Sequence, residues 1–146
     1  MTLKKRIRIG ILLCLMAMLA CSFGITAYAD TTDVLWTYNC NTWGMDTPYR
    51  SKSNDSWVYC RPMSGTTTKA RAYGADDDSG SDREMCSEVV HIPVGSKGFI
   101  WNWVNEHGHG YASLRFRPET AGNVTNWGYW SSDSVWESGG VEYGAP

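Results

Sequence analysis

Short runs in which apolar and polar residues alternate are the feature that most restricts the fold of this chain. Seven such runs, separated by turn residues, lie at residues 34–40, 56–61, 69–73, 89–94, 99–104, 111–117 and 126–130. Alternation with a period of two is typical of half-buried β-strands. No later segment keeps apolar residues at helical spacing, and Pro93, Gly95 and Gly98 would break a helix over residues 89–104. The sequence therefore predicts an antiparallel β-sandwich of about seven strands, with a small β-barrel as the alternative.

The first 29 residues predict export. A basic start, Lys4 to Arg8, precedes an apolar run over residues 9–25, and Ala27-Tyr28-Ala29 places small residues at Ala27 and Ala29, where a signal peptidase cuts. We expect a signal-peptide helix over residues 1–29, cleavage before Asp30, and a secreted, extracellular protein. A weaker alternative is lipid attachment at Cys21, which follows Leu19-Ala20.

The residues after the signal peptide form a single predicted domain. We expect a β-rich domain over residues 30–137 and a flexible, Gly-rich tail over 138–146. Residues 30–146 contain nine basic residues against 15 acidic ones, a net charge of −6. This balance argues against nucleic-acid binding, which needs clustered Lys and Arg. No second apolar run long enough to span a membrane follows, so the predicted partner is an extracellular ligand or cell surface.

Three cysteines remain after cleavage: Cys40, Cys60 and Cys86. Export makes a disulfide chemically accessible, and an odd number leaves one thiol over. Cys60 alternates with apolar neighbours and is expected to be buried. The pair Cys40–Cys86 is the predicted disulfide, with three free thiols as the alternative.

The acidic segment over residues 76–82 is the sharpest local motif. Asp76, Asp78 and Asp82 alternate round Gly80, and carboxylates spaced in this way resemble the start of a Ca²⁺ loop. The bidentate Glu expected at the twelfth position is absent, because Ser87 stands there. The segment therefore predicts either a solvated acidic loop or a structural Ca²⁺ site, and no other cofactor.

A second candidate for metal binding lies at the expected hairpin tip over residues 105–110. His107 and His109, with His91 as a third ligand, could hold Zn²⁺ if they shared a face. Glycines on both sides of His109 favour a polar loop instead.

Tryptophan is abundant, with eight residues, and two aromatic groups are candidates for a binding patch. Trp101 and Trp103 form one stripe, with Asn102 between them pointing the other way, and Trp127 and Trp130 belong to the second group. Exposed aromatic side chains stack on ligands, whereas buried ones make the core of a sandwich. The sequence leaves both interpretations open.

No catalytic signature is present. The chain has neither a Gly-x-Ser-x-Gly nucleophile elbow nor a His-Glu-x-x-His helix motif. We therefore expect a protein that is not an enzyme.

The segment Gly128-Tyr129-Trp130-Ser131-Ser132-Asp133-Ser134, with Tyr49-Arg50 and Trp57-Val58, resembles a family of small secreted Gram-positive bacterial proteins of unknown function. The resemblance implies a secreted β-rich protein and brings no catalytic residues. We expect a non-enzymatic module that binds a surface, a polymer or a protein. The alternative is a bacteriocin-like toxin of the lactococcin 972 type, which the chain resembles more loosely in size and in aromatic and Gly content.

Overall fold

The computed structural model describes residues 30–39, 44–119, 122 and 124–144. The predicted signal-peptide helix, with Ala27 and Ala29, and the predicted disulfide partner Cys40 lie outside the described residues. Within the described part, no helix has the length and apolarity needed to cross a membrane.

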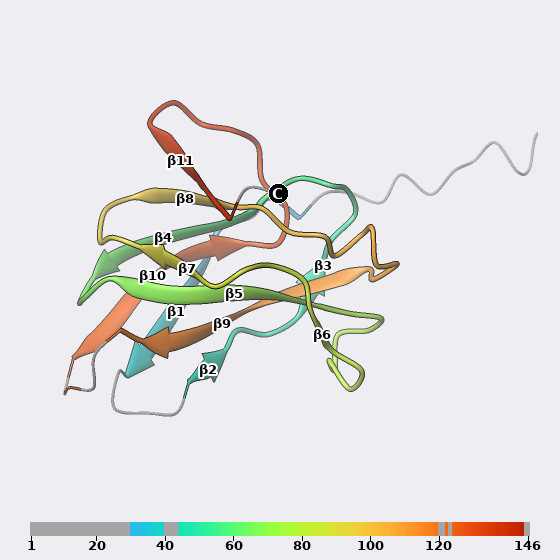
Figure 1. The fold of residues 1–146 in the computed structure, drawn as a ribbon, viewed down its shortest axis with the longest axis horizontal. Coiled ribbons are helices and arrows are strands. Elements are labelled where there is room, and N and C mark those ends of the chain that lie inside the picture. The colour runs from blue at the N-terminus through green and yellow to red at the C-terminus, as the bar shows by residue number, and fades with distance from the viewer. Residues whose placement is uncertain (1–29, 40–43, 120–121, 123, 145–146) are drawn as a thin grey trace, which may run out of the picture.

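Two packed sheets form the fold, without closure into a barrel, so the predicted β-sandwich is confirmed (Figure 1). The first sheet contains, in spatial order, β1 (Val34–Asn39), β10 (Thr125–Ser131), β4 (Val58–Ser64), β8 (Lys97–Ile100) and β11 (Gly140–Tyr143). The second contains β2 (Met45–Asp46), β9 (Tyr111–Pro118), β5 (Thr68–Ala75) and β6 (Glu84–Met85), with β3 (Arg50–Ser51) beside β9 and β7 (Val90–Ile92) beside β5.

All seven predicted strands are present, as β1, β4, β5, β7, β8, β9 and β10. The run over residues 99–104 is strand only as far as Ile100, because Asn102 and its neighbours leave the sheet. The backbone N–H of Trp103 then donates to the Cys86 carbonyl at 2.9 Å, which ties this exit segment to the end of β6.

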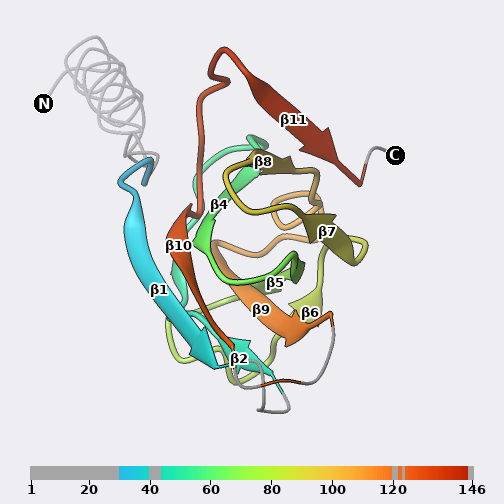
Figure 2. The same ribbon diagram turned by 90° about the vertical axis from the view of Figure 1, so that its left-hand side faces the viewer.

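The predicted flexible tail is corrected at residues 140–143. These residues form β11, which pairs in parallel with β8, and the Trp101 N–H donates to the Tyr143 carbonyl at 2.9 Å. Figure 2 shows β11 at one edge of the first sheet and β1 at the other. A Gly-rich composition predicted fraying, but the free edge of β8 supplies the hydrogen-bond partners that a strand needs.

Side chains from both sheets make up the core. Trp36 on β1 stacks on Phe116 of β9, with ring centroids 4.2 Å apart. The two alanines of β5, Ala70 and Ala72, are buried, as the alternation of residues 69–73 predicts. The core therefore contains aromatic rings from both sheets together with small residues of β5.

Gly128 marks an irregularity where β10 crosses β4. The register shifts between Trp127 and Gly128, and a Cβ atom at Gly128 would lie 2.2 Å from the Arg61 carbonyl oxygen. Only glycine allows this approach, and Trp130, two residues further along β10, is buried in the core.

Candidate functional site

A pocket of about 250 Å³ lies on the outward face of the five-stranded sheet. We call it the outer pocket; it is lined by Thr31, Asp33, Tyr59, Ser131, Ser134, Val135, Trp136 and Glu137. Tyr59 faces outward because Val58 and Cys60, its neighbours on β4, both belong to the core. The first two lining residues precede β1, and the last four follow β10, so sequence-distant segments build the pocket.

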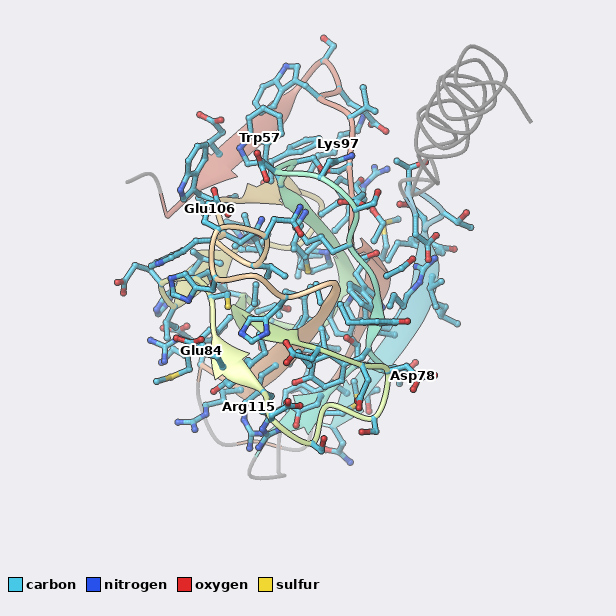
Figure 3. All side chains as sticks on the ribbon, turned by 90° about the vertical axis from the view of Figure 1, so that its right-hand side faces the viewer. Trp57, Asp78, Glu84, Lys97, Glu106 and Arg115 are labelled. Atoms are coloured by element: carbon cyan, nitrogen blue, oxygen red, sulfur yellow. The ribbon has the colours of Figure 1, made fainter. Side chains whose placement is uncertain are left out.

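Aromatic rings form one wall of the outer pocket and extend beyond it. Trp136 lies against Phe99 with centroids 4.8 Å apart, and against Trp57 at 5.8 Å. Tyr59 lies 5.3 Å from Phe99 on the neighbouring strand. Figure 3 shows Trp57 and Lys97 at the same end of the molecule. The segment after β10 therefore folds over the sheet, where it buries Phe99 and leaves Trp136 46% exposed.

Two carboxylates face the outer pocket and repel each other. Burial raises the pKa of Asp33, and the negative charge of Glu137 raises it further, against the opposing effects of Ser131, Arg50 and Arg61. Burial likewise raises the pKa of Tyr59, followed by the charges of Asp33 and Glu137. None of the described lining residues is Lys or Arg, although Lys97 forms an ion pair with Glu137 from outside, at 2.6 Å.

A buried charge network includes Asp133, which lies in the chain between two serines that line the outer pocket. Lys52 and Asp133, whose side chains have no exposed surface, are joined by an Nζ–Oδ1 contact of 3.0 Å. The Asp133 carboxylate also accepts hydrogen bonds from the Ser53 backbone N–H at 3.0 Å and from the Ser53 and Ser56 hydroxyls at 3.2 Å each. We call these four residues the Asp133 network.

The Asp133 network is built to hold a charged carboxylate. Burial by itself would raise the pKa of Asp133, but the hydrogen bond from Ser53 and the Lys52 charge outweigh it and hold the pKa below its usual value. Burial lowers the pKa of Lys52, with Asp133 opposing that change. Ser131 and Ser134 lie on either side of Asp133 in the chain. The network therefore holds in place two hydroxyl-bearing residues that line the outer pocket.

The predicted aromatic patch is corrected. Trp130 is fully buried in the core, so it cannot contact a ligand. Trp101 and Trp103 are partly buried, and Trp103 lies against His107 with centroids 6.3 Å apart. Trp127 is partly buried and lies 6.2 Å from Tyr129 on β10. Among the ring contacts of the described residues, none joins two of these four tryptophans.

Asn102, which lies between two of these tryptophans in the chain, is buried rather than exposed to solvent. It is 4% exposed, and its side-chain amide donates to the carbonyls of Ser56 and Ile100 at 3.1 and 3.2 Å. The aromatic rings that do gather, round Phe99, come from residues far apart in sequence, which periodicity within one strand cannot detect.

The acidic segment does not assemble the predicted calcium ligands. Asp76 makes a contact of 2.7 Å with Nδ1 of His109, and Figure 3 shows Asp78 well away from Glu84. Asp82 is exposed. Among the residues that the structure describes, no three His, Cys, Asp or Glu side chains are placed to hold a metal ion.

His107 and His109 instead converge on Glu84, while His91 pairs with Glu119 at 2.7 Å. His109 Nε2 lies 3.2 Å from Glu84, and a Cβ atom on Gly74 would meet the His109 ring at 2.6 Å. Burial alone would lower the pKa of His109, but the contacts with Asp76 and Glu84 outweigh it and raise the pKa.

Replacing His109 by Gln is expected to change how stability depends on pH. A histidine whose folded pKa is raised adds stability that is complete below its unfolded pKa of about 6.5 and is lost as pH rises through the folded pKa. The parent should therefore lose stability relative to the variant between pH 6 and pH 8 in urea unfolding. Asp76→Asn should shrink that loss, because it removes one contact that raises the His109 pKa. Parallel parent and variant profiles would contradict this role.

The two described cysteines are buried free thiols. Burial raises the pKa of both, that of Cys86 to about 11. Cys86 is a free thiol here, and the predicted Cys40–Cys86 disulfide stays a prediction because Cys40 lies outside the described residues. Cys86 lies in the core beside Gly74, and a Cβ atom added to Gly74 would lie 2.9 Å from the Cys86 sulfur.

Comparison with protein families identifies a family for this chain. The model of the DUF2712 family, described as a protein of unknown function, matches residues 25–134. The chain belongs to this family. The match includes the Asp133 network, while Trp136 and Glu137 of the outer pocket lie beyond its end. No curated protein matches the chain. No solved structure matches it either.

Proposed function

We propose that this DUF2712 protein is an exported, non-enzymatic binding module and that the outer pocket binds the protonated amine of its ligand. The observation that carries the proposal is the pair of mutually repelling carboxylates, Asp33 and Glu137, in a pocket walled by Tyr59 and Trp136. A cation placed between them would relieve the repulsion and would also interact with the aromatic faces.

The size of the pocket restricts the ligand to a side chain or small headgroup. A volume of about 250 Å³ is below the range of roughly 300–1,000 Å³ that holds drug-sized molecules. A lysine side chain or an amine substituent on a surface polymer is of suitable size and charge. Ser131 and Thr31 supply hydroxyl oxygens that can accept from an ammonium group.

Binding is tested by calorimetric titration with Nα-acetyl-lysine amide, beside its neutral Nε-acetylated form. We expect a dissociation constant on the order of millimolar for the cationic probe and no measurable binding of the neutral one. Glu137→Gln and Asp33→Asn should each weaken binding about fivefold, as expected for partly exposed charges. Glu142→Gln, which removes an exposed carboxylate on β11 outside the pocket, is the matched control and should bind normally.

The same variants separate ligand binding from a structural role. Asp33 is exposed and its pKa is raised rather than lowered, so its charge is not expected to stabilise the fold. Asp33→Asn should therefore bind more weakly while unfolding at the same temperature as the parent or a higher one. Equal binding of the neutral probe, or equal weakening by Glu142→Gln, would refute the proposal.

Export and toxicity have separate tests. The exported protein recovered from culture medium should begin at Asp30, as the signal sequence predicts. A binding module should not inhibit growth when added to a panel of related bacteria, whereas the bacteriocin-like alternative requires inhibition.

A further inference from the structure

Asp30, which follows the predicted cleavage site, makes several hydrogen bonds and an ion pair with residues far away in the sequence. The backbone N–H of Asp30 donates to Asp133 Oδ2 at 3.2 Å, and the Asp30 carbonyl accepts from the Asp133 N–H at 3.3 Å and from the Ser132 hydroxyl at 3.4 Å. The Asp30 carboxylate pairs with Arg50, which also donates to the Thr32 carbonyl at 2.7 Å.

We propose that the buried Asp133 carboxylate is the docking site for the α-ammonium group created at Asp30 when the signal peptide is removed. Signal removal would then complete the charge network of the mature protein. The inference concerns maturation rather than ligand binding, and it rests on the export part of the proposed function.

The chemistry is a simple hydrolysis by a signal peptidase. Water cleaves the amide bond between Ala29 and Asp30; Ala29 keeps the oxygen as a carboxylate, and the Asp30 nitrogen leaves as an amine that is protonated. The Asp30 nitrogen thus changes from a neutral amide with one N–H group to an ammonium cation with three N–H groups. This nitrogen already lies 3.2 Å from Asp133 Oδ2. Charge-assisted hydrogen bonds of this kind are about twice as strong as neutral ones.

The surroundings favour an added cation at this point. Lys52 contacts the other carboxylate oxygen, Oδ1, whereas the hydrogen-bond donors that Oδ2 receives from the described residues are the neutral groups of Ser53 and the Asp30 nitrogen. Arg50 neutralises the Asp30 side chain. Asp55 and Glu106 add negative charge near Lys52 at longer range. The opposing positive charges are therefore those of Lys52 and Arg50, and each has a carboxylate partner of its own.

Two chains prepared by cutting a removable tag in vitro test the proposal, without any need for export. One begins at Asp30; the other begins at Ala29 and so keeps an amide at Asp30. At pH 7 the chain that begins at Asp30 should have an unfolding equilibrium constant about tenfold smaller, the effect of one pKa unit of differential interaction. The advantage should be lost as pH rises through the folded pKa of the α-amine, which should lie above its ordinary range of about 7.7–8.0.

Acetylating the α-amine of the Asp30 chain is the matched control, because it removes the charge without adding a residue. The acetylated chain should behave like the chain that begins at Ala29. Equal stability of all three chains, with an α-amine that titrates in its ordinary range, would overturn the docking site. An exported protein that begins elsewhere than Asp30 would instead refute the predicted cleavage site, so the two failures are distinguishable.

Discussion

Lys52→Met is expected to lower the free energy of unfolding by about 3–5 kcal/mol at pH 7, the usual cost of removing one partner from a buried ion pair. In a chain that begins at Ala29, which lacks the α-ammonium group proposed for Asp30, Asp133 would keep its hydrogen bonds from Ser53 and Ser56 but would carry an uncompensated charge with no exposed surface. Urea unfolding followed by tryptophan fluorescence measures the change.

The double variant Lys52→Met, Asp133→Leu is the test of coupling. It should be less destabilised than the sum of the two single variants, because neither buried charge remains without its partner. Additive effects would show that the 3.0 Å contact carries no interaction energy. The parent should also lose stability in acid, since a carboxyl group with a depressed folded pKa adds stability above its unfolded pKa of about 3.9, and this is lost as pH falls through the folded pKa.

Trp130→Ala is expected to lower the free energy of unfolding by about 3–5 kcal/mol as well, for a different reason. Trp130 has no exposed surface and lies in the core cluster, so truncation removes buried apolar area and leaves a cavity. It also removes the indole ring that the Arg50 guanidinium faces at 5.6 Å. Thermal and urea unfolding measure the loss.

Trp136→Ala is the control for Trp130→Ala, because Trp136 is 46% exposed and lies outside the core cluster. It should cost no more than about 1.5 kcal/mol, and it should weaken amine binding at the outer pocket. Equal destabilisation by the two substitutions would contradict the assignment of Trp130 to the core and Trp136 to the pocket wall.

The segment from Trp130 to Glu137 joins three parts of the molecule. Trp130 fills the core, Asp133 pairs with Lys52, and Trp136 and Glu137 line the outer pocket. Ser132 links the same segment to β3, since its hydroxyl donates to the Ser51 carbonyl at 2.7 Å. The outer pocket therefore depends on a segment whose position is fixed by the packing of Trp130 in the core and by the ion pair of Asp133 with Lys52.

The local alternation of apolar and polar residues was sufficient to predict the seven main strands. Alternation placed Ala70 and Ala72 on the buried face of β5 and predicted a buried Cys60, because a strand with one face towards a core must alternate. It also gave the sandwich class, since seven such strands without helices have few other ways to bury their apolar faces.

Pattern could not say which aromatic residues face a ligand. Trp130 and Trp127 alternate with residues of similar character, and only the packing of the second sheet against one face of the first decides that Trp130 points to the core. The tail was misjudged for a related reason: whether residues 140–143 form a strand depends on the free edge of β8, which no property of those residues reveals.

The sequence by itself determined the β-sandwich and its seven main strands, because hydrophobic periodicity is a local property of the chain. Only the tertiary structure decided the site. Lys52 and Asp133 are 81 residues apart, and Asp33 and Glu137 meet across the outer pocket from opposite ends of the domain. Burial and charge pairing of this kind depend on which segments the two sheets bring together, and a single sequence carries no direct record of such contacts.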